Sequence, residues 1–298
     1  MATFHEGELA VQKQAGTQRM ASRVGTGIQP FIFDGADKFL RDQVMLVTSS
    51  IDEQKHVWAS ILTGEPGFLQ PIDETRLYIL ALPLDSDPLA QNIKPGSLVG
   101  LLAIDLANRL RVRVNGIVAQ QTADGFIVEA RQVYGNCQKY IQSRQIAEIP
   151  ARADHHAQHG LGLGSDQQEW IRSADTFFIA SAHASGGADA SHRGGNPGFV
   201  HVLSDRVLEF PDYAGNTMFN TLGNIAVNPA TGLLFVDFKT GRTLQLTGQA
   251  TILWQSERIA EYAGAQRIVQ FEVAEGIETS SGLAFRFGHP RYSRFNPG

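Results

Sequence analysis

The chain is 298 residues long, twice the usual domain length of ~150 residues, which favours two domains or one large barrel. Its 43% hydrophobic and 18% charged residues are typical of a globular protein with a large buried core and exclude disorder or a collagen-like structure. The net charge of −5 provides no positive field that would attract nucleic acid or an anionic membrane. We therefore expect a small-molecule substrate as the partner.

The cysteine count and the first residues bear on the compartment. The single cysteine, Cys137, cannot form an intrachain disulfide, and residues 1–14 show no basic segment followed by an apolar stretch. No window reaches the ~18 consecutive apolar residues of a membrane span. We expect a cytoplasmic protein in which Cys137 is a buried, inert thiol, because no histidine or aspartate base adjoins it in the sequence.

Segments of the first half recur in the second half at an offset of 131 or 132 residues. Solenoid repeats span 20–50 residues, so an offset of this length predicts two complete domains in tandem. The matched pairs are FLR (39–41) with WIR (170–172), GEPGF (64–68) with GNPGF (195–199), GLLAID (100–105) with GLLFVD (232–237), and LRVRVNG (110–116) with RTLQLTG (242–248).

In chain order, the sequence predicts an N-terminal arm or helix over residues 1–30, a first β-rich domain over 31–150 and a second over 165–298. β-branched and aromatic runs such as VMLVTSS and TFFIASA predict strands, and glycine-containing turns such as Asp124-Gly125 predict hairpins. The pattern from Ser165 to Gln168 resembles a capping box with Ser165 as the cap, which predicts a helix at the start of the second domain.

Residues 150–164 are polar and glycine-rich and are interpreted as a linker. Its glycines resemble a dinucleotide-binding turn, but no strand precedes them. His155 and His159, next to His156, would present two imidazoles to zinc if the segment were helical; a solvated linker is the other interpretation. The segment His5-Glu6-Gly7-Glu8 also carries metal-ligand types, without a partnering cluster, and is interpreted as an ordinary helix start.

Two polar clusters of the second half suit a phosphate group. Residues 189–199 join the Ser191 hydroxyl, the His192 imidazole and the Arg193 guanidinium to glycines that would let the backbone approach a ligand. A structural turn with a surface salt bridge would explain the same residues.

The second cluster, residues 211–224, follows the strand RVLEF and resembles a loop leading into a short helix. Amides and hydroxyls there would complete a phosphate site at a helix N-terminus. Helix capping alone would also explain Asn216 and Thr217.

Together with NPATGLLFVDFKTGRTLQLTGQA, these clusters resemble the pyridoxamine 5′-phosphate oxidase-like FMN-binding split-barrel family. S-x-R-G, P-G-F-V, P-D-x-x-G-N, N-P-x-x-G-L-L-F and T-L-x-L-x-G-x-A follow in the family's order over most of residues 170–255. FLRDQ, GLLAID, RVRVNG and QVYGNCQKYI match more weakly, with Gln138 where relatives often have proline. The resemblance implies a β-rich α+β chain of two tandem six-stranded Greek-key split β-barrels with short flanking helices.

The resemblance further implies that the chain binds FMN between the two barrels and is a flavin-dependent oxidoreductase with an unknown small-molecule substrate. Tyr213 and Met218 stand where many relatives have arginine or lysine, so the phosphate would depend more heavily on Arg193. Carried over onto this sequence, the cofactor-binding residues are Ser191, His192, Arg193, Gly194, Tyr213, Asn216, Thr217 and Asn220.

The first half lacks most of this phosphate cluster. The 131-residue offset places Ser60, Ile61 and Leu62 at the positions of the S-x-R motif, so the hydroxyl is kept while the imidazole and the cation are lost. The loop at 84–87 is acidic and would repel phosphate. We expect one flavin per chain, in tandem domains that imitate a homodimer with one site lost; a homodimer of whole chains would still allow sites built from different chains.

Two alternatives remain open from the sequence. One is a non-catalytic carrier of haem or a deazaflavin on the same fold, with His183, His192 or His201 as iron ligands. The other is a structural pseudo-dimer whose cofactor site has decayed in both halves. The sequence does not identify the substrate, and pyridoxamine phosphate oxidase activity is not expected. Candidate residues for substrate contacts lie in the C-terminal tail: Arg286, His289, Arg291 and Arg294.

Overall fold

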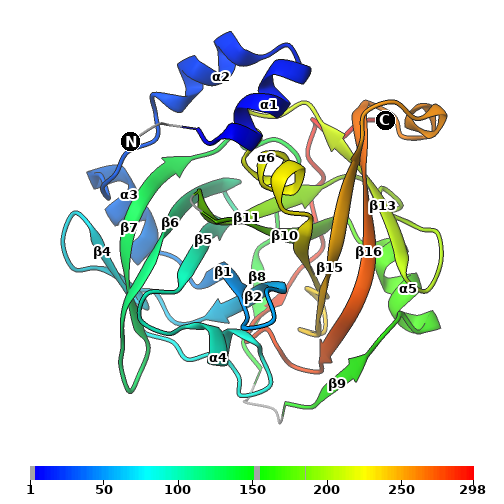
Figure 1. The fold of residues 1–298 in the computed structure, drawn as a ribbon. Coiled ribbons are helices and arrows are strands. Elements are labelled where there is room, and N and C mark those ends of the chain that lie inside the picture. The colour runs from blue at the N-terminus through cyan, green and yellow to red at the C-terminus, as the bar shows by residue number, and fades with distance from the viewer. Residues whose placement is uncertain (1–3, 151–154, 185) are drawn as a thin grey trace.

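The computed structural model describes residues 4–150, 155–184 and 186–298. Within these ranges the chain forms two large antiparallel sheets accompanied by short helices (Figure 1). The expected β-rich α+β class is therefore confirmed. No helix in the described ranges has the length and apolar character needed to cross a bilayer.

The first sheet has the strand order β2-β1-β5-β6-β7-β4-β3. Strands that do not follow one another in the chain are neighbours, because β1 pairs with β5 and β4 pairs with β7, as Greek-key connections require. The elements of this half are α1 (Glu6–Gln14), α2 (Gln18–Gly25), α3 (Asp34–Arg41), β1 (Met45–Ile51), β2 (Val57–Thr63), β3 (Leu69–Pro71), β4 (Arg76–Ile79), α4 (Leu89–Asn92), β5 (Leu98–Asp105), β6 (Leu110–Gln121) and β7 (Phe126–Gly135).

The second sheet has the order β11-β10-β14-β15-β16-β13-β12, and β9 also pairs with β16. A separate two-stranded sheet joins β8 to β17. The elements are β8 (Ile146–Glu148), β9 (Ala157–Gly160), α5 (Ser165–Ser173), β10 (Thr176–His183), β11 (Gly187–Gly194), β12 (His201–Val202), β13 (Val207–Tyr213), α6 (Asn220–Val227), β14 (Ala230–Val236), β15 (Thr243–Leu253), η1 (Glu257–Glu261), β16 (Ala265–Thr279) and β17 (Arg286–Phe287).

The two sheets repeat one another strand for strand. If each of β1 to β7 in the first strand order is replaced by the corresponding strand of β10 to β16, the result is the strand order of the second sheet. Strands β8 and β9 have no counterpart among the described strands of the first sheet. The register repeats as well: Ser60 lies opposite Thr48, and Ser191 lies opposite Ile179. Because both members of each pair are displaced by 131 residues, Ser60 and Ser191 occupy equivalent positions.

The expectation of six strands in each half was wrong. The described residues form a seven-stranded and an eight-stranded sheet. The additional strands β3, β12 and β9 have three, two and four residues, too short for the period-two alternation that reveals a strand in a sequence.

The linker interpretation of residues 150–164 was wrong for part of this segment. Residues 157–160 form β9, which pairs with β16, while residues 151–154 lie outside the described ranges. His155, His156 and His159 are exposed and sit on or beside a strand, so the helical spacing required for the zinc hypothesis does not exist there. Helix α5 is capped by Gly164, not Ser165, and the Gly164 amide donates to Gln167 at 3.1 Å.

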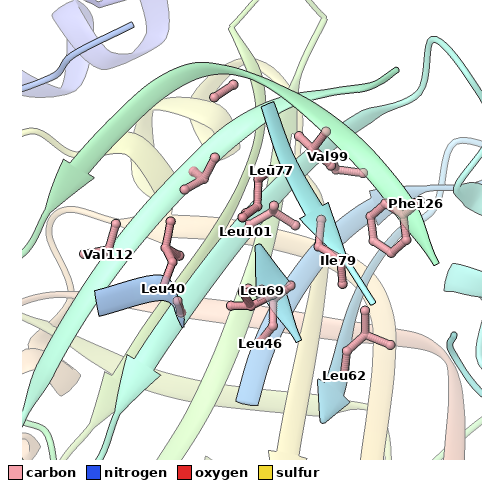
Figure 2. Close-up of a cluster of buried hydrophobic side chains, with 14 of the residues drawn as sticks. Leu40, Leu46, Leu62, Leu69, Leu77, Ile79, Val99, Leu101, Val112 and Phe126 are labelled. Carbon is pink, nitrogen blue, oxygen red and sulfur yellow. The ribbon is translucent and has the colours of Figure 1, made fainter. Parts of the chain in front are cut away.

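Three large apolar cores and one small cluster around Tyr134 and Met218 hold the described residues together. One lies inside the first sheet, where Figure 2 shows Leu46, Leu62 and Leu101 among its labelled side chains. A second fills the other sheet around Phe177. A third joins the two sheets face to face and includes Val47 from the first half. The sheets therefore pack as one continuous apolar unit.

Two equivalent glycines let the sheets approach closely. Gly100 on β5 and Gly232 on β14 occupy the first position of the repeated G-L-L motif. A Cβ atom on Gly100 would lie 2.6 Å from the backbone of Ala188 and Asp189, and one on Gly232 would lie 2.6 Å from the Val57 carbonyl oxygen. The glycines repeated in the sequence thus mark the points of closest contact between the sheets.

Helix α1 packs directly on α6 (Figure 1). A Cβ atom on Gly7 would collide with the Gly223 carbonyl oxygen, and one on Gly223 would collide with Glu8. Two side-chain hydrogen bonds add to this contact: Asn220 donates to Glu8 at 2.6 Å, and Gln12 donates to the Met218 carbonyl oxygen at 3.0 Å. The N-terminal helix therefore supports the start of α6 and the loop before it.

Candidate functional site

A pocket lies where the edge strand β11 of the second sheet meets strand β6 of the first. It encloses about 110 Å³, which is room for several water molecules or one phosphate-sized group. We call it the phosphate pocket. All eight residues predicted from the sequence as cofactor ligands line it, namely Ser191, His192, Arg193, Gly194, Tyr213, Asn216, Thr217 and Asn220.

Strand β11 supplies the centre of the phosphate pocket. Because side chains alternate along a strand, Asp189, Ser191 and Arg193 share one face and His192 points to the other. The Ser191 hydroxyl is buried, 2.9 Å from the Thr221 hydroxyl and 3.2 Å from the Asp189 carboxylate. Arg193 donates to the carbonyl oxygen of His192 at 3.1 Å. Ser191, His192 and Arg193 all line the pocket, with His192 on the other face of the strand from the hydroxyl and the guanidinium.

Two further arginines, which were not predicted from the sequence, line the pocket from the first sheet. Arg111 and Arg113 alternate with valines on β6 and so share one face. Arg113 is buried, pairs with Asp189 at 2.8 Å and donates to Ser191. Arg111 donates to the Cys137 carbonyl oxygen at 2.7 Å. The signal for both was present: cations alternate with valines in LRVRVNG, whereas the equivalent RTLQLTG has threonine and glutamine there.

The phosphate pocket concentrates positive charge. Burial and the neighbouring charges of Arg113 and Arg193 lower the pKa of Arg111 to about 9. Burial is also the main cause of the lowered pKa of Arg193. Asp189 offsets one of these cations through its ion pair with Arg113. A dianion in the pocket would relieve the remaining repulsion between guanidinium groups.

Helix α6 begins at the phosphate pocket without a side-chain cap. Its N-cap residue, Phe219, has a φ of 61°, and no described side chain caps the helix. The first three residues of α6 line the pocket. Of the five described non-glycine residues with positive φ, three line it, with Tyr140 at 65° and Thr217 at 64° beside Phe219. Free amides at a helix start and strained backbone are both common at anion-binding sites.

Asn216 and Thr217 shape the loop before α6 and do not cap the helix. The Asn216 side chain donates to Asn136 at 2.6 Å and accepts from the Met218 amide at 3.1 Å. The Thr217 hydroxyl donates to the Asn216 carbonyl oxygen at 2.6 Å. These bonds tie the loop of the second half to the segment that follows β7 in the first half.

That segment, residues 136–140, forms the outer wall of the phosphate pocket. The ring of Tyr140 packs on Tyr213 with 5.1 Å between centroids, and the Tyr140 hydroxyl donates to the Ala214 carbonyl oxygen at 3.0 Å. Cys137 lines the pocket and is exposed, so the expectation of a buried thiol was wrong. The reason is that the segment crosses from one sheet to the other and keeps one side open to solvent.

Several buried polar atoms of the phosphate pocket have no hydrogen-bond partner among the described residues. Both ring nitrogens of His192 are among them, with Nε of Arg111, Nε of Arg113 and Nδ2 of Asn136. Burial, with the nearby arginine charges, holds the pKa of His192 well below its ordinary value, so the ring is neutral. Unpartnered buried polar groups are costly, and the N–H groups among these atoms fit a phosphate ester, whose oxygens would accept hydrogen bonds from Arg111, Arg113, Asn136 and the one protonated nitrogen of His192.

The equivalent place in the first half is filled by the chain itself. Ser60 donates to the Asp87 carboxylate at 2.6 Å, and the Leu89 amide at the start of α4 donates to the same carboxylate at 2.9 Å. Gln245, equivalent to Arg113, donates to Ser60 at 3.0 Å. Leu62, at the position of Arg193, belongs to the apolar core (Figure 2).

The glycines near β11 serve packing, not ligand approach. A Cβ atom on Gly194 would collide with the Tyr140 carbonyl oxygen, and one on Gly195 would lie 2.6 Å from the Phe199 ring. These residues are glycines because the outer wall of the phosphate pocket and an aromatic ring occupy the space.

The three histidines considered as iron ligands lie in different places. His192 lines the phosphate pocket, His201 stacks on Tyr262 with 4.2 Å between ring centroids, and His183 stacks on His5 at 4.0 Å. The four tail residues Arg286, His289, Arg291 and Arg294 do not line the phosphate pocket.

His5, Glu6 and His183 form a cluster with metal-ligand chemistry, since their ligand atoms lie within 4.8 Å of one another. The hydrogen bonds speak against a metal ion there. The Gly7 amide donates to Nδ1 of His5 at 3.2 Å, and the Gly186 amide donates to Nδ1 of His183 at 2.7 Å. Each neutral ring therefore carries its proton on Nε2, where a metal would need a lone pair.

Comparison with known proteins agrees with the sequence resemblance. Residues 163–287 match the family described as pyridoxamine 5′-phosphate oxidase, and no curated protein matches the chain. A putative pyridoxamine 5′-phosphate oxidase from Lactobacillus delbrueckii is 14% identical, with a TM-score of 0.32 over 39% of this chain and 94% of its own.

Two further solved structures are similar to part of the chain. An FMN-binding protein from Syntrophomonas wolfei is 6% identical, with a TM-score of 0.29 over 38% of this chain and 84% of its own. HupZ from Group A Streptococcus is 12% identical, with a TM-score of 0.31 over 37% of this chain and 90% of its own.

Proposed function

We propose that this protein binds FMN through the phosphate pocket and is a flavin-dependent oxidoreductase, because residues 163–287 match the family described as pyridoxamine 5′-phosphate oxidase. The observation that carries the proposal is a set of buried donors without a partner: Nε of Arg111, Nε of Arg113 and the single N–H of the neutral His192 ring. The residues that carry them line the pocket together with the first residues of α6, which has no side-chain cap. A phosphate monoester has the charge and the acceptor oxygens to accept from these N–H groups.

The residues of the phosphate pocket would have different roles in binding the phosphate. Arg111 and Arg193 supply charge, because Asp189 already neutralises Arg113. Arg113 then positions Ser191, to which it donates. The first amides of α6 supply donors in fixed orientation. Tyr140 and Tyr213 offer an aromatic surface at the outer wall, suited to exclude water from a planar ring.

FMN, when bound, would supply the redox chemistry, and the protein would supply binding, orientation and exclusion of solvent. Such a division of roles requires no nucleophile and base among the side chains. The substrate is a small molecule whose structure the proposal leaves open.

The test is a comparison of FMN with riboflavin, which differ only in the phosphate. Removing one charge-assisted contact costs about 1.5–3 kcal/mol, so Arg193→Ala should weaken FMN binding roughly 10- to 150-fold and leave riboflavin binding unchanged. Arg172→Ala, an exposed arginine on α5, is the matched control and should change neither. Affinities are measured by quenching of flavin fluorescence.

Equal affinity for FMN and riboflavin in the parent protein would refute the phosphate assignment. The absorbance spectrum of the purified protein tests the cofactor itself: flavin bands support the proposal, whereas a Soret band, or a deazaflavin that binds more tightly than FMN, would favour the carrier alternative. A stoichiometry of one FMN per chain is expected, because Asp87 occupies the equivalent place in the first half. Two bound flavins per chain would contradict this.

A further inference from the structure

A second cavity, of about 430 Å³, lies between α1 and the two sheets. Asn115 of the first sheet, Asp189 of the second and Glu8 of α1 are among its lining residues. The two cavities adjoin, since Arg113 lines the phosphate pocket, its ion-pair partner Asp189 lines the second cavity and Asn220 lines both. We call it the acceptor cavity, because of the atoms that face it.

Asn115 contributes an unpartnered acceptor. Its side chain is buried, with the residue 6% exposed, and its Oδ1 has no hydrogen-bond partner among the described residues. Its Nδ2 lies 3.5 Å from both the Asp189 carboxylate and the Gln132 side-chain oxygen. Both neighbours are acceptors, so the amide nitrogen must face them. The carbonyl oxygen is therefore the atom left without a donor.

Glu8 contributes a second acceptor to the lining. Its carboxylate accepts from the His5 amide at 2.9 Å and from Asn220 at 2.6 Å, one bond to each oxygen, which leaves further lone pairs. Burial is the main cause of the raised pKa of Glu8, and the charge of Asp189 raises it further. Arg131, which also lines the cavity, is exposed at its rim.

We propose that the acceptor cavity binds a small organic ammonium ion, whose N–H groups donate to the Asn115 carbonyl oxygen and to the Glu8 carboxylate. An ammonium group has three donors and no acceptor, which matches a cavity lined by an orphaned carbonyl and by the carboxylates of Glu8 and Asp189. A neutral alcohol satisfies fewer of these acceptors, and an anion is repelled. Asn220 lines both cavities, whereas Asn115 and Glu8 line only the acceptor cavity.

The test uses n-butylammonium as the probe, with n-butanol and n-butyrate as the neutral and anionic controls of the same length. Calorimetric titration into the full chain should give one site, with both controls at least 10-fold weaker. Asn115→Ala should weaken the probe about 10-fold or more. Because it also removes the two 3.5 Å contacts of Nδ2, the melting temperature of the variant is measured alongside, and binding is compared at a temperature where the variant is folded.

Thr247→Ala is the matched control, since Thr247 is the residue equivalent to Asn115 and donates to the Val57 carbonyl oxygen on the other side of the molecule. It should leave probe binding unchanged. Unchanged binding in Asn115→Ala, or n-butanol binding as well as the ammonium, would overturn the proposal. If saturating FMN displaced the probe, the two sites would not bind independently. If the protein failed to bind FMN, the proposed function would be wrong but the ammonium proposal would stand.

The pH dependence supplies an independent readout. Burial raises the pKa of Glu8 to about 7, and a bound cation favours the ionised carboxylate. Probe affinity should therefore rise between roughly pH 6 and pH 8, and Glu8→Gln should abolish the rise. A rise of the same size in Glu8→Gln would refute the role of Glu8. The other charged or titratable groups around it or in the cavity lining are His5, Glu6, Arg113, Arg131, Tyr134, His183 and Asp189.

Discussion

An alanine at Gly100 or at Gly232 would push the two sheets apart at equivalent positions, with different consequences for the phosphate pocket. Each added Cβ atom would lie 2.6 Å from backbone of the other sheet. Ordinary carbon contact begins near 3.4 Å, so the strands must separate by about 0.8 Å. Overpacking of this kind costs about 1–3 kcal/mol of unfolding free energy, and we expect that loss in both variants.

Only Gly100→Ala should also weaken FMN binding. The backbone that it displaces belongs to Ala188 and Asp189, so the 2.8 Å ion pair between Arg113 and Asp189 would stretch to ~3.6 Å, beyond hydrogen-bond distance. Loss of this charged contact loosens the wall that positions Ser191 and should lower FMN affinity about tenfold. Gly232→Ala displaces residues 57–59 instead, on the side where Asp87 occupies the equivalent place.

Urea unfolding measures the first effect and flavin fluorescence titration the second, on the same preparations. The matched pair separates the general cost of overpacking from the local cost at the phosphate pocket. If both variants weaken FMN binding equally, the assignment of the pocket to one side of the molecule is wrong. If neither loses stability, the sheets do not meet as tightly as the glycine contacts require.

Two further predictions concern α1. Gly7→Ala should detach α1 from α6, because the new Cβ atom collides with Gly223. We expect faster amide hydrogen exchange in residues 6–14 and weaker FMN binding. Unchanged exchange would contradict the contact between the two helices. Glu8→Gln should be more stable than the parent by up to about 3 kcal/mol above pH 7. Burial raises the pKa of Glu8 from 4.5 to about 7, so the parent loses stability as pH rises across that window. Urea unfolding at several pH values should show the difference vanish below pH 4.5.

The duplicated architecture was predictable because both halves keep the same motifs at nearly the same spacing. Gly100 and Gly232 illustrate the reason: each is fixed by close contact with the other sheet, so neither copy can exchange it. The strand count was not predictable, because strands as short as β12 (two residues) leave no alternating pattern.

The candidate site was predictable where it depends on one stretch of chain. Ser191, His192 and Arg193 are consecutive, and their chemistry is visible in the sequence. Arg111 and Arg113 were missed because they lie about 80 residues earlier, on a strand of the other sheet, and only the packing of the two sheets brings them to β11. The exposure of Cys137 depends on the same packing, since its segment bridges the sheets.

The carboxylate of Asp87 provides the first half with a covalently attached acceptor that cannot diffuse away. Its bonds to Ser60 and to the start of α4 persist whether or not a cofactor is available. That place is therefore filled permanently, and under the proposed function only the other half would respond to cofactor supply. Ser60 also accepts from Gln245 of the second sheet, so the fused chain keeps one ordered contact between its sheets without a cofactor, an asymmetry that two identical separate chains would not have.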